Sequence, residues 1–153
     1  MRNNIFNLLL FTLLLGLTGL GVSWYANTLI LQNWLVNKQP HNLNFLDSML
    51  TMLILPAVVS ITAYLLINIL KTTSKISYIV TLVLSTICVK ISRDMSFQNY
   101  LIMFQIQGTP DKETLEVIGF EAGVGYLLSL ICTIMLYYVQ KHFPLDLDTK
   151  MKH

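Results

Sequence analysis

Charge is scarce in this chain, and the places where it is missing are informative. Only 12% of the 153 residues are Asp, Glu, Lys or Arg. Four long intervals contain none of them, namely those between Arg2 and Lys38, Asp47 and Lys71, Lys75 and Lys90, and Glu121 and Lys141. A soluble protein would expose too much hydrocarbon along such runs, whereas a membrane-spanning helix needs about 20 mostly apolar residues. The sequence therefore predicts a small membrane protein with little soluble mass.

Cysteine and histidine are few and dispersed. Cys88 and Cys132 both fall inside apolar runs and lack the close spacing of a redox or metal motif, so we interpret them as buried packing residues. His41, His142 and His153 lie far apart in the sequence. The expected topology places His41 and His142 on opposite sides of the membrane, which leaves no Ser/His/Asp or Cys/His arrangement. We expect neither an enzyme nor a bound cofactor or metal.

Ionisable residues are also missing from the centres of the apolar runs. Five ionisable residues are expected near the outer ends of the spans, and they are Asp47, Lys90, Arg93, Asp94 and Glu121. Pumps and proton-coupled transporters normally carry an acid or a histidine at mid-depth, so ion-coupled transport is disfavoured. The net charge of +2 is too small to indicate direct binding of nucleic acid.

The four apolar runs predict an all-α, polytopic four-helix transmembrane protein. We expect a single membrane domain over residues 1–153, with spans at about 5–30, 46–70, 76–92 and 120–140. The first run is too long for a cleaved signal peptide and is expected to stay as an anchor. Pro56 removes a backbone donor inside the second span, which predicts a kink there.

The connection between the third and fourth spans carries its own helical pattern. Apolar side chains fall at positions i, i+3, i+4 and i+7, which are Phe97, Tyr100, Leu101 and Phe104. This spacing predicts a short amphipathic helix along the outer membrane surface, where it would act as a sensing segment. Gly108 is expected to end it. Thr109-Pro110-Asp111 then predicts the start of a helix that runs through Gly119 into the fourth span.

Small residues recur at helical spacing in three of the spans. One face of the third span carries Ser77, Thr81, Ser85 and Cys88, and one face of the fourth carries Ala122, Gly125, Ser129, Cys132 and Thr133. Gly119 and Gly123 add a GxxxG pair, and Gly19 and Ser23 a similar pair in the first span. Helices in lipid associate where small residues let backbones approach. Gly119, Gly123, Gly125 and Ser129 are therefore candidates for packing within one chain, or for contacts between subunits of a homo-oligomer.

The distribution of basic residues predicts the orientation. With the N-terminus in the cytoplasm, six Lys and Arg residues lie inside and four outside, which is the direction favoured in multi-pass proteins. We expect a bacterial inner-membrane protein with both termini cytoplasmic. The candidate partner-binding residues of the cytoplasmic face are Lys71, Lys75, Lys141, His142 and Phe143. Lipid headgroups are the other ligand that this basic face suits.

The layout of the chain suggests a family. It combines small size and four spans with the Phe97-Gln98-Asn99-Tyr100-Leu101 segment and the Lys71–Lys75 loop. In this layout the chain resembles the membrane subunit of the Kiwa bacterial anti-phage system. The resemblance implies a non-enzymatic anchor that oligomerises in the lipid bilayer and senses phage-induced membrane disturbance. It also implies a soluble, DNA-binding cytoplasmic subunit as partner. Colicin-type immunity proteins share this size and number of spans, so an immunity protein and a small oligomeric channel remain as alternatives.

Overall fold

The computed structural model describes residues 2–37, 45–72, 75–103 and 112–143, and these residues form four α-helices. The helices are α1 (Arg2–Asn37), α2 (Phe45–Leu70), α3 (Lys75–Met103) and α4 (Lys112–His142). Each contains a stretch long and apolar enough to cross a membrane, at Asn4–Tyr25, Leu53–Leu70, Lys75–Met95 and Gly123–His142. The predicted all-α, four-helix fold is confirmed.

The helices extend further than the spans expected from the sequence. α2 runs from Phe45 to Leu70, while α1 continues to Asn37 and α3 continues to Met103, beyond the spans expected at 5–30 and 76–92. No Pro or Gly lies within α3, so nothing in its backbone chemistry stops the helix at its charged residues. The predicted continuity through Gly119 is confirmed, because α4 begins at Lys112 and ends at His142.

The outer sensing segment belongs largely to α3. Phe97, Tyr100 and Leu101 lie in the last turns of this helix, while Phe104 and Gly108 lie outside the described residues. Between Lys75 and Met103 the structure therefore shows one continuous helix and not a span followed by a separate short helix. The i, i+3, i+4 spacing correctly indicates helix. It carries no information about where that helix begins when no breaker residue precedes it.

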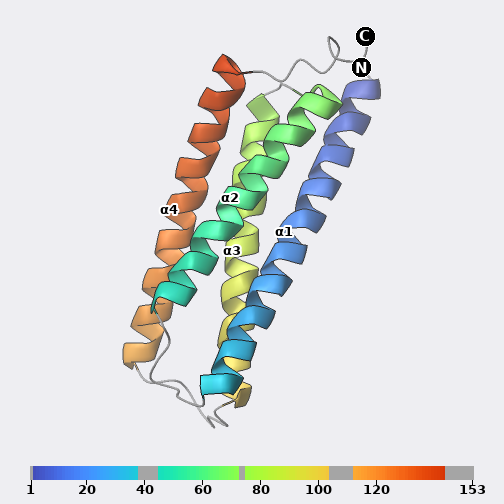
Figure 1. Cartoon of the computed structure of the whole chain (residues 1–153). Coiled ribbons are helices and arrows are strands. Elements are labelled where there is room, and N and C mark those ends of the chain that lie inside the picture. Colours follow the sequence, from blue (N-terminus) through green and yellow to red (C-terminus); the bar gives the residue numbers. More distant parts are fainter. Residues whose placement is uncertain (1, 38–44, 73–74, 104–111, 144–153) are drawn as a thin grey trace.

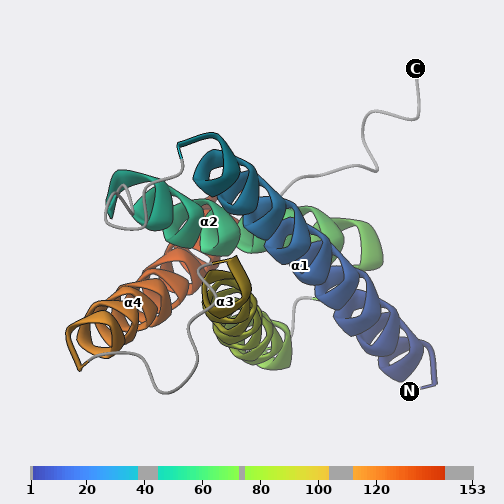
Figure 2. The same cartoon turned by 90° about the horizontal axis from the view of Figure 1, so that it is seen from below.

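The helices run alternately up and down, so the start of α1, the end of α2, the start of α3 and the end of α4 share one end of the bundle (Figure 1). α2 and α3 touch each other, and each also packs against both α1 and α4. In the described parts of α1 and α4 no Cα atom of one helix lies within 8 Å of a Cα atom of the other. Seen along the bundle, α2 and α3 accordingly separate α1 from α4 (Figure 2).

Buried positions recur at every fourth residue along the helices. Fully or almost fully buried residues at this spacing are Leu15, Gly19, Ser23 and Asn27 in α1, Leu55, Val59, Ala63 and Ile67 in α2, Ser77, Thr81, Ser85 and Val89 in α3, and Gly125, Ser129 and Thr133 in α4. A four-residue period follows the i±4 ridge of a helix, along which two helices interlock. Large apolar side chains such as Leu13, Ile61 and Met135 point outward, as a lipid-facing surface requires.

The described interior of the bundle contains two apolar clusters, and buried hydroxyl groups occur along its whole length. One cluster contains Phe11, Leu15, Val59, Ala63, Ile67 and Leu136, and a second contains Leu55, Cys88 and Val89. Between and beyond them the buried side chains are mainly Ser and Thr. Pro56 is buried within α2, and the kink predicted there stays a prediction.

Gly19 is a point of close approach between α1 and α3. A Cβ atom on Gly19 would lie 2.5 Å from Cys88 Sγ and 3.5 Å from a Val59 methyl group. Gly16 and Gly21 lie in the same helix but would have nothing within 4 Å of an added Cβ. The close helix contact predicted from the Gly19 and Ser23 spacing is confirmed, and it depends on Gly19 having no side chain.

We expect Gly19→Ala to destabilise the protein by about 1–3 kcal/mol, the usual cost of overpacking a well-packed interior. The matched control Gly16→Ala should be near neutral, because its added methyl group meets open space. Removing the obstructing sulfur in Gly19→Ala/Cys88→Ala should recover part of the loss. Unfolding of the purified protein in mixed micelles measures all three. Equal stability of the Gly19 and Gly16 variants would contradict the close contact.

Candidate functional site

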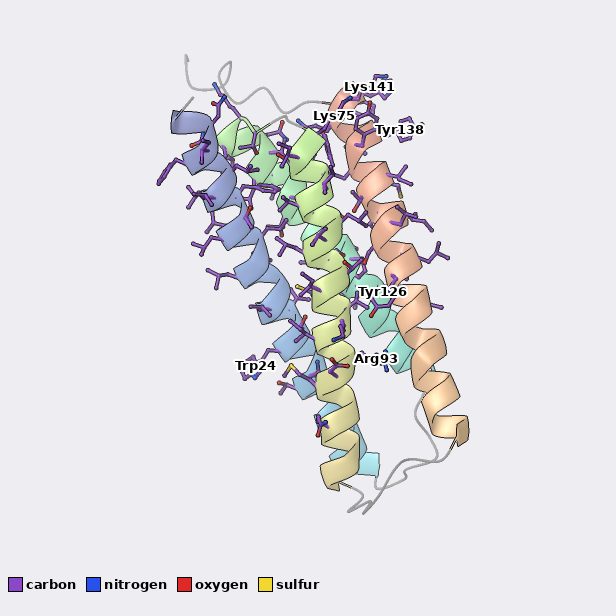
Figure 3. All side chains as sticks on the ribbon, turned by 180° about the vertical axis from the view of Figure 1, so that it is seen from behind. Trp24, Lys75, Arg93, Tyr126, Tyr138 and Lys141 are labelled. Atoms are coloured by element: carbon purple, nitrogen blue, oxygen red, sulfur yellow. The ribbon has the colours of Figure 1, made fainter. Side chains whose placement is uncertain are left out.

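The five predicted partner-binding residues gather at one end of the bundle. Lys71 follows the last residue of α2, Lys75 is the first residue of α3, and Lys141, His142 and Phe143 close α4. All five are exposed. We call this set the basic end. Figure 3 shows Lys75 and Lys141 at this end beside Tyr138, with Trp24 and Arg93 toward the other end.

A helix-capping turn fixes the backbone of the α2–α3 connection. Lys71 adopts a left-handed conformation, with φ of 52°, and the Thr72 N–H donates to the Ile67 carbonyl at 3.1 Å. This is the Schellman pattern, in which the residue after the cap usually is Gly. The Ser77 hydroxyl then donates to the Thr72 carbonyl at 2.5 Å and links the turn to α3. A lysine thus occupies a position whose backbone favours Gly.

A reciprocal amide pair joins α2 to α4 one turn before this connection. Asn68 Nδ2 donates to Gln140 Oε1 at 3.1 Å, and Gln140 Nε2 donates to Asn68 Oδ1 at 2.9 Å. Asn68 Nδ2 also donates to the Tyr64 carbonyl at 2.6 Å. Because Gln140 is buried and Asn68 half-buried, the pair satisfies polar groups that would be costly to leave unbonded in an apolar setting.

Two further bonds attach the ends of α1 and α4 to α2. The Tyr64 hydroxyl donates to the Phe143 carbonyl at 2.5 Å, and the Phe143 N–H donates to the Val139 carbonyl at 2.7 Å. Asn7 Nδ2 donates to the Leu70 carbonyl at 2.9 Å. The last two turns of α2 therefore hold the start of α1 and the end of α4. The basic end is carried on this hydrogen-bonded frame.

Gly125 and Ser129 take part in packing within one chain. The Ser85 hydroxyl of α3 donates to the Ser129 hydroxyl at 2.9 Å, and Ser129 donates to the Gly125 carbonyl at 2.9 Å. Gly123, by contrast, is exposed and has nothing within 4 Å of an added Cβ. Gly119 lies in α4, and its surroundings are outside the described part of the structure.

A second polar contact, between α1 and α3, was not expected from the sequence. Asn27 Nδ2 donates to the Ser23 carbonyl at 2.8 Å and to the Ser92 hydroxyl at 3.1 Å. The Ser23 hydroxyl donates to the Gly19 carbonyl at 2.8 Å and also approaches the Cys88 carbonyl at 3.3 Å. Ser92 continues the small-residue face of α3 by one more turn, and this periodicity is the signal that could have revealed it.

The ion pair between Lys90 and Asp94, toward the opposite end, contributes little to stability. Lys90 Nζ lies 3.7 Å from Asp94 Oδ2, one turn along α3, and both side chains are exposed. Exposed pairs of this kind are weak because water screens them. The acidic side chains of Glu116 and Glu121 lie outside the described residues.

Comparisons with protein families, with curated proteins and with solved structures find no match to this chain. The functional argument accordingly rests on the geometry. The basic end offers cations and an exposed phenylalanine on a fixed frame, which is chemistry suited to non-covalent contact through charge and apolar surface.

The amide pair can be tested by a double-mutant cycle with Asn68→Ala and Gln140→Ala. We expect a coupling energy of about 1–2 kcal/mol, because hydrogen bonds between helices in membranes contribute about 0.6 kcal/mol on average and up to about 1.7 kcal/mol each. The measurement is the free energy of unfolding in mixed micelles of wild type, the two single variants and the double variant. Strictly additive losses would show that the two amides do not interact.

Proposed function

We propose that this protein is a multi-pass anchor and sensor subunit of a bacterial inner membrane that recruits a soluble partner at its basic end. The supporting observation is the basic end itself. Its five exposed residues come from three separate segments, and hydrogen bonds join the α4 end to α2 and the start of α3 to the turn after α2. A surface that is set in position before binding loses less conformational entropy when a partner docks.

The proposed orientation places the basic end in the cytoplasm. The described helix ends gathered there carry Lys71, Lys75 and Lys141 and no Asp or Glu, whereas Asp94 accompanies Lys90 near the other end. Cytoplasmic segments of multi-pass proteins are enriched in Lys and Arg. With four crossings, the two termini lie on the same side of the membrane, here the cytoplasmic side.

The chemistry of the basic end defines the kind of partner. Lys71, Lys75 and Lys141 favour an acidic surface, and the Phe143 side chain, 71% exposed, is an apolar anchor for a pocket on that surface. The Kiwa resemblance proposes such a partner as a soluble, DNA-binding subunit, with the present chain as the membrane component of a bacterial defence complex. In that arrangement nucleic acid contacts the partner and not this chain.

The continuity of α3 supports a route from the sensing segment to the basic end. Phe97, Tyr100 and Leu101 lie at one end of this helix and Lys75 at the other, about 38 Å apart at 1.5 Å per residue. No Pro or Gly interrupts the helix between them. A tilt imposed on the sensing segment by a disturbed membrane would therefore move Lys75 as part of the same rigid body.

A channel and an immunity protein are the two alternative functions. A pore through a single chain needs unoccupied polar groups along its wall, but Ser85, Ser129 and Thr133 bond to one another or to backbone carbonyls. A pore lined by several subunits would need polar side chains on the outer surface of each subunit. An immunity protein needs no cytoplasmic partner, so recovery of the chain alone from its host would favour that function.

Reversing two charges at the basic end tests partner recruitment. We expect Lys71→Glu/Lys75→Glu to lower recovery of the cytosolic partner at least about tenfold, since like charges across an interface are costly. The measurement is affinity capture of the tagged, gently solubilised protein, followed by mass spectrometry.

The matched control is Lys90→Glu/Lys112→Glu, which reverses two charges outside the basic end and should capture the partner normally. Membrane fractionation checks that both variants insert. A correctly inserted Lys71→Glu/Lys75→Glu protein that captures the partner as well as wild type would remove the basic end from the proposal.

A further inference from the structure

Aromatic rings join α3 to α4 on one side of the basic end. The Tyr78 ring of α3 meets the Tyr137 ring of α4 edge to face, with centroids 5.4 Å apart. Tyr138 lies next to Tyr137 with a centroid distance of 5.8 Å and is 58% exposed. Tyrosine is enriched where hydrocarbon meets headgroups, because its ring is apolar and its hydroxyl polar. This seam is thus placed where a lipid headgroup would lie.

Two lysines flank this aromatic seam. Lys75 precedes Tyr78 by three residues and Lys141 follows Tyr137 by four, and residues at these spacings share a helix face. Because α3 and α4 run in opposite directions, Lys75 at the start of α3 and Lys141 at the end of α4 lie at the same end of the bundle, near Tyr138 (Figure 3). Long lysine stems lie along apolar surface and deliver the ammonium group to the polar boundary. Two cations therefore lie at the same end of the bundle as the paired rings.

An apolar track continues from the seam along α4. Ile134 and Leu130 lie one and two turns before Tyr138, and they are 47% and 44% exposed. The helix ends described here, residues 2–8, 64–72, 75–80 and 136–143, contain no Asp or Glu that could neutralise the two lysines. The surface therefore presents two cations, then phenol groups, then exposed hydrocarbon. That order matches the order of groups in a phospholipid.

We propose that the α3–α4 seam at the basic end binds an anionic phospholipid. Its phosphate lies between the ammonium groups of Lys75 and Lys141, the Tyr138 hydroxyl donates to a headgroup oxygen, and an acyl chain follows Ile134 and Leu130. An anionic headgroup is preferred to phosphatidylcholine, because choline would bring a third cation to two lysines.

This lipid site goes beyond the proposed function and does not depend on it. It occupies the α3–α4 side of the basic end and shares Lys75 and Lys141 with the proposed partner surface, while Lys71, His142 and Phe143 lie outside the seam. A bound headgroup would neutralise two of the charges that a partner meets. The site can be tested with the purified protein in the absence of any partner, so failure here and failure of partner recruitment are separate results.

The test is native mass spectrometry of the full chain in detergent, titrated with phosphatidylglycerol or phosphatidylcholine. We expect wild type to retain phosphatidylglycerol preferentially. Lys75→Gln/Lys141→Gln should weaken its binding by about 25-fold, since each lysine near an anionic lipid contributes about fivefold. The control Lys90→Gln/Lys112→Gln also loses two charges and should bind as wild type does.

Two further measurements keep the proposal open to refutation even if the double variant folds poorly. Tyr138→Leu, a change at an exposed position, should weaken phosphatidylglycerol binding while leaving thermal stability in lipid-free detergent unchanged. Inorganic phosphate at millimolar concentration should not displace the lipid. Equal retention of the two lipids by wild type, unaltered binding by Lys75→Gln/Lys141→Gln, or displacement by free phosphate would each overturn the assignment.

Discussion

Hydrogen bonding of buried polar groups within the bundle is the constraint on which this structure depends, and among the described side chains only Ser60 Oγ, Thr72 Oγ1 and Arg93 Nε are buried without such a bond. Moving an apolar side chain from lipid hydrocarbon into the bundle interior gains no hydrophobic free energy. Helices that face lipid are therefore held together by close packing and by hydrogen bonds between them. Here Gly19 lets α1 approach α3, Ser85 and Ser129 join α3 to α4, and Asn68 and Gln140 join α2 to α4. The outward surface is then free to be almost entirely hydrocarbon.

These contacts also explain why the function that we propose is placed at the basic end. Most of the length of each helix is committed either to packing or to the apolar surface, which leaves the helix ends as the places where charge can be carried. The Tyr64 and Asn7 bonds fix α4 and α1 to the last turns of α2, and the capping turn at Lys71 fixes the start of the path to α3. The partner site and the lipid site that we propose share this one frame.

The sequence predicted the helices because their signal is local, but it predicted few of the contacts between them. The gaps between charged residues located all four helices, and the spacing of Ser77, Thr81 and Ser85 located the buried face of α3. The end of α3 was placed too early, because charge marks where a helix leaves hydrocarbon and not where it stops. The Asn68–Gln140 pair joins residues 72 positions apart, so no local pattern could reveal it.

The capping turn at Lys71 was missed for another reason. The left-handed position after a helix is normally signalled by Gly, and here a lysine occupies it. Sequence reasoning could therefore identify Lys71 as a basic residue of a short loop but not as part of a fixed turn. The oligomeric role considered for Gly125 and Ser129 shows a related limit, because a small-residue face looks the same whether its partner helix belongs to the same chain or to another copy.

The central claim is that the four helices cross the membrane with the basic end in the cytoplasm, and cysteine labelling in intact cells tests it most directly. Single cysteines would replace Lys71 and Lys112 in a chain whose Cys88 and Cys132 are changed to Ala. We predict that a membrane-impermeant maleimide labels position 112 in intact spheroplasts and position 71 only after permeabilisation. Labelling of position 71 in intact spheroplasts, or equal labelling of both positions there, would contradict the account.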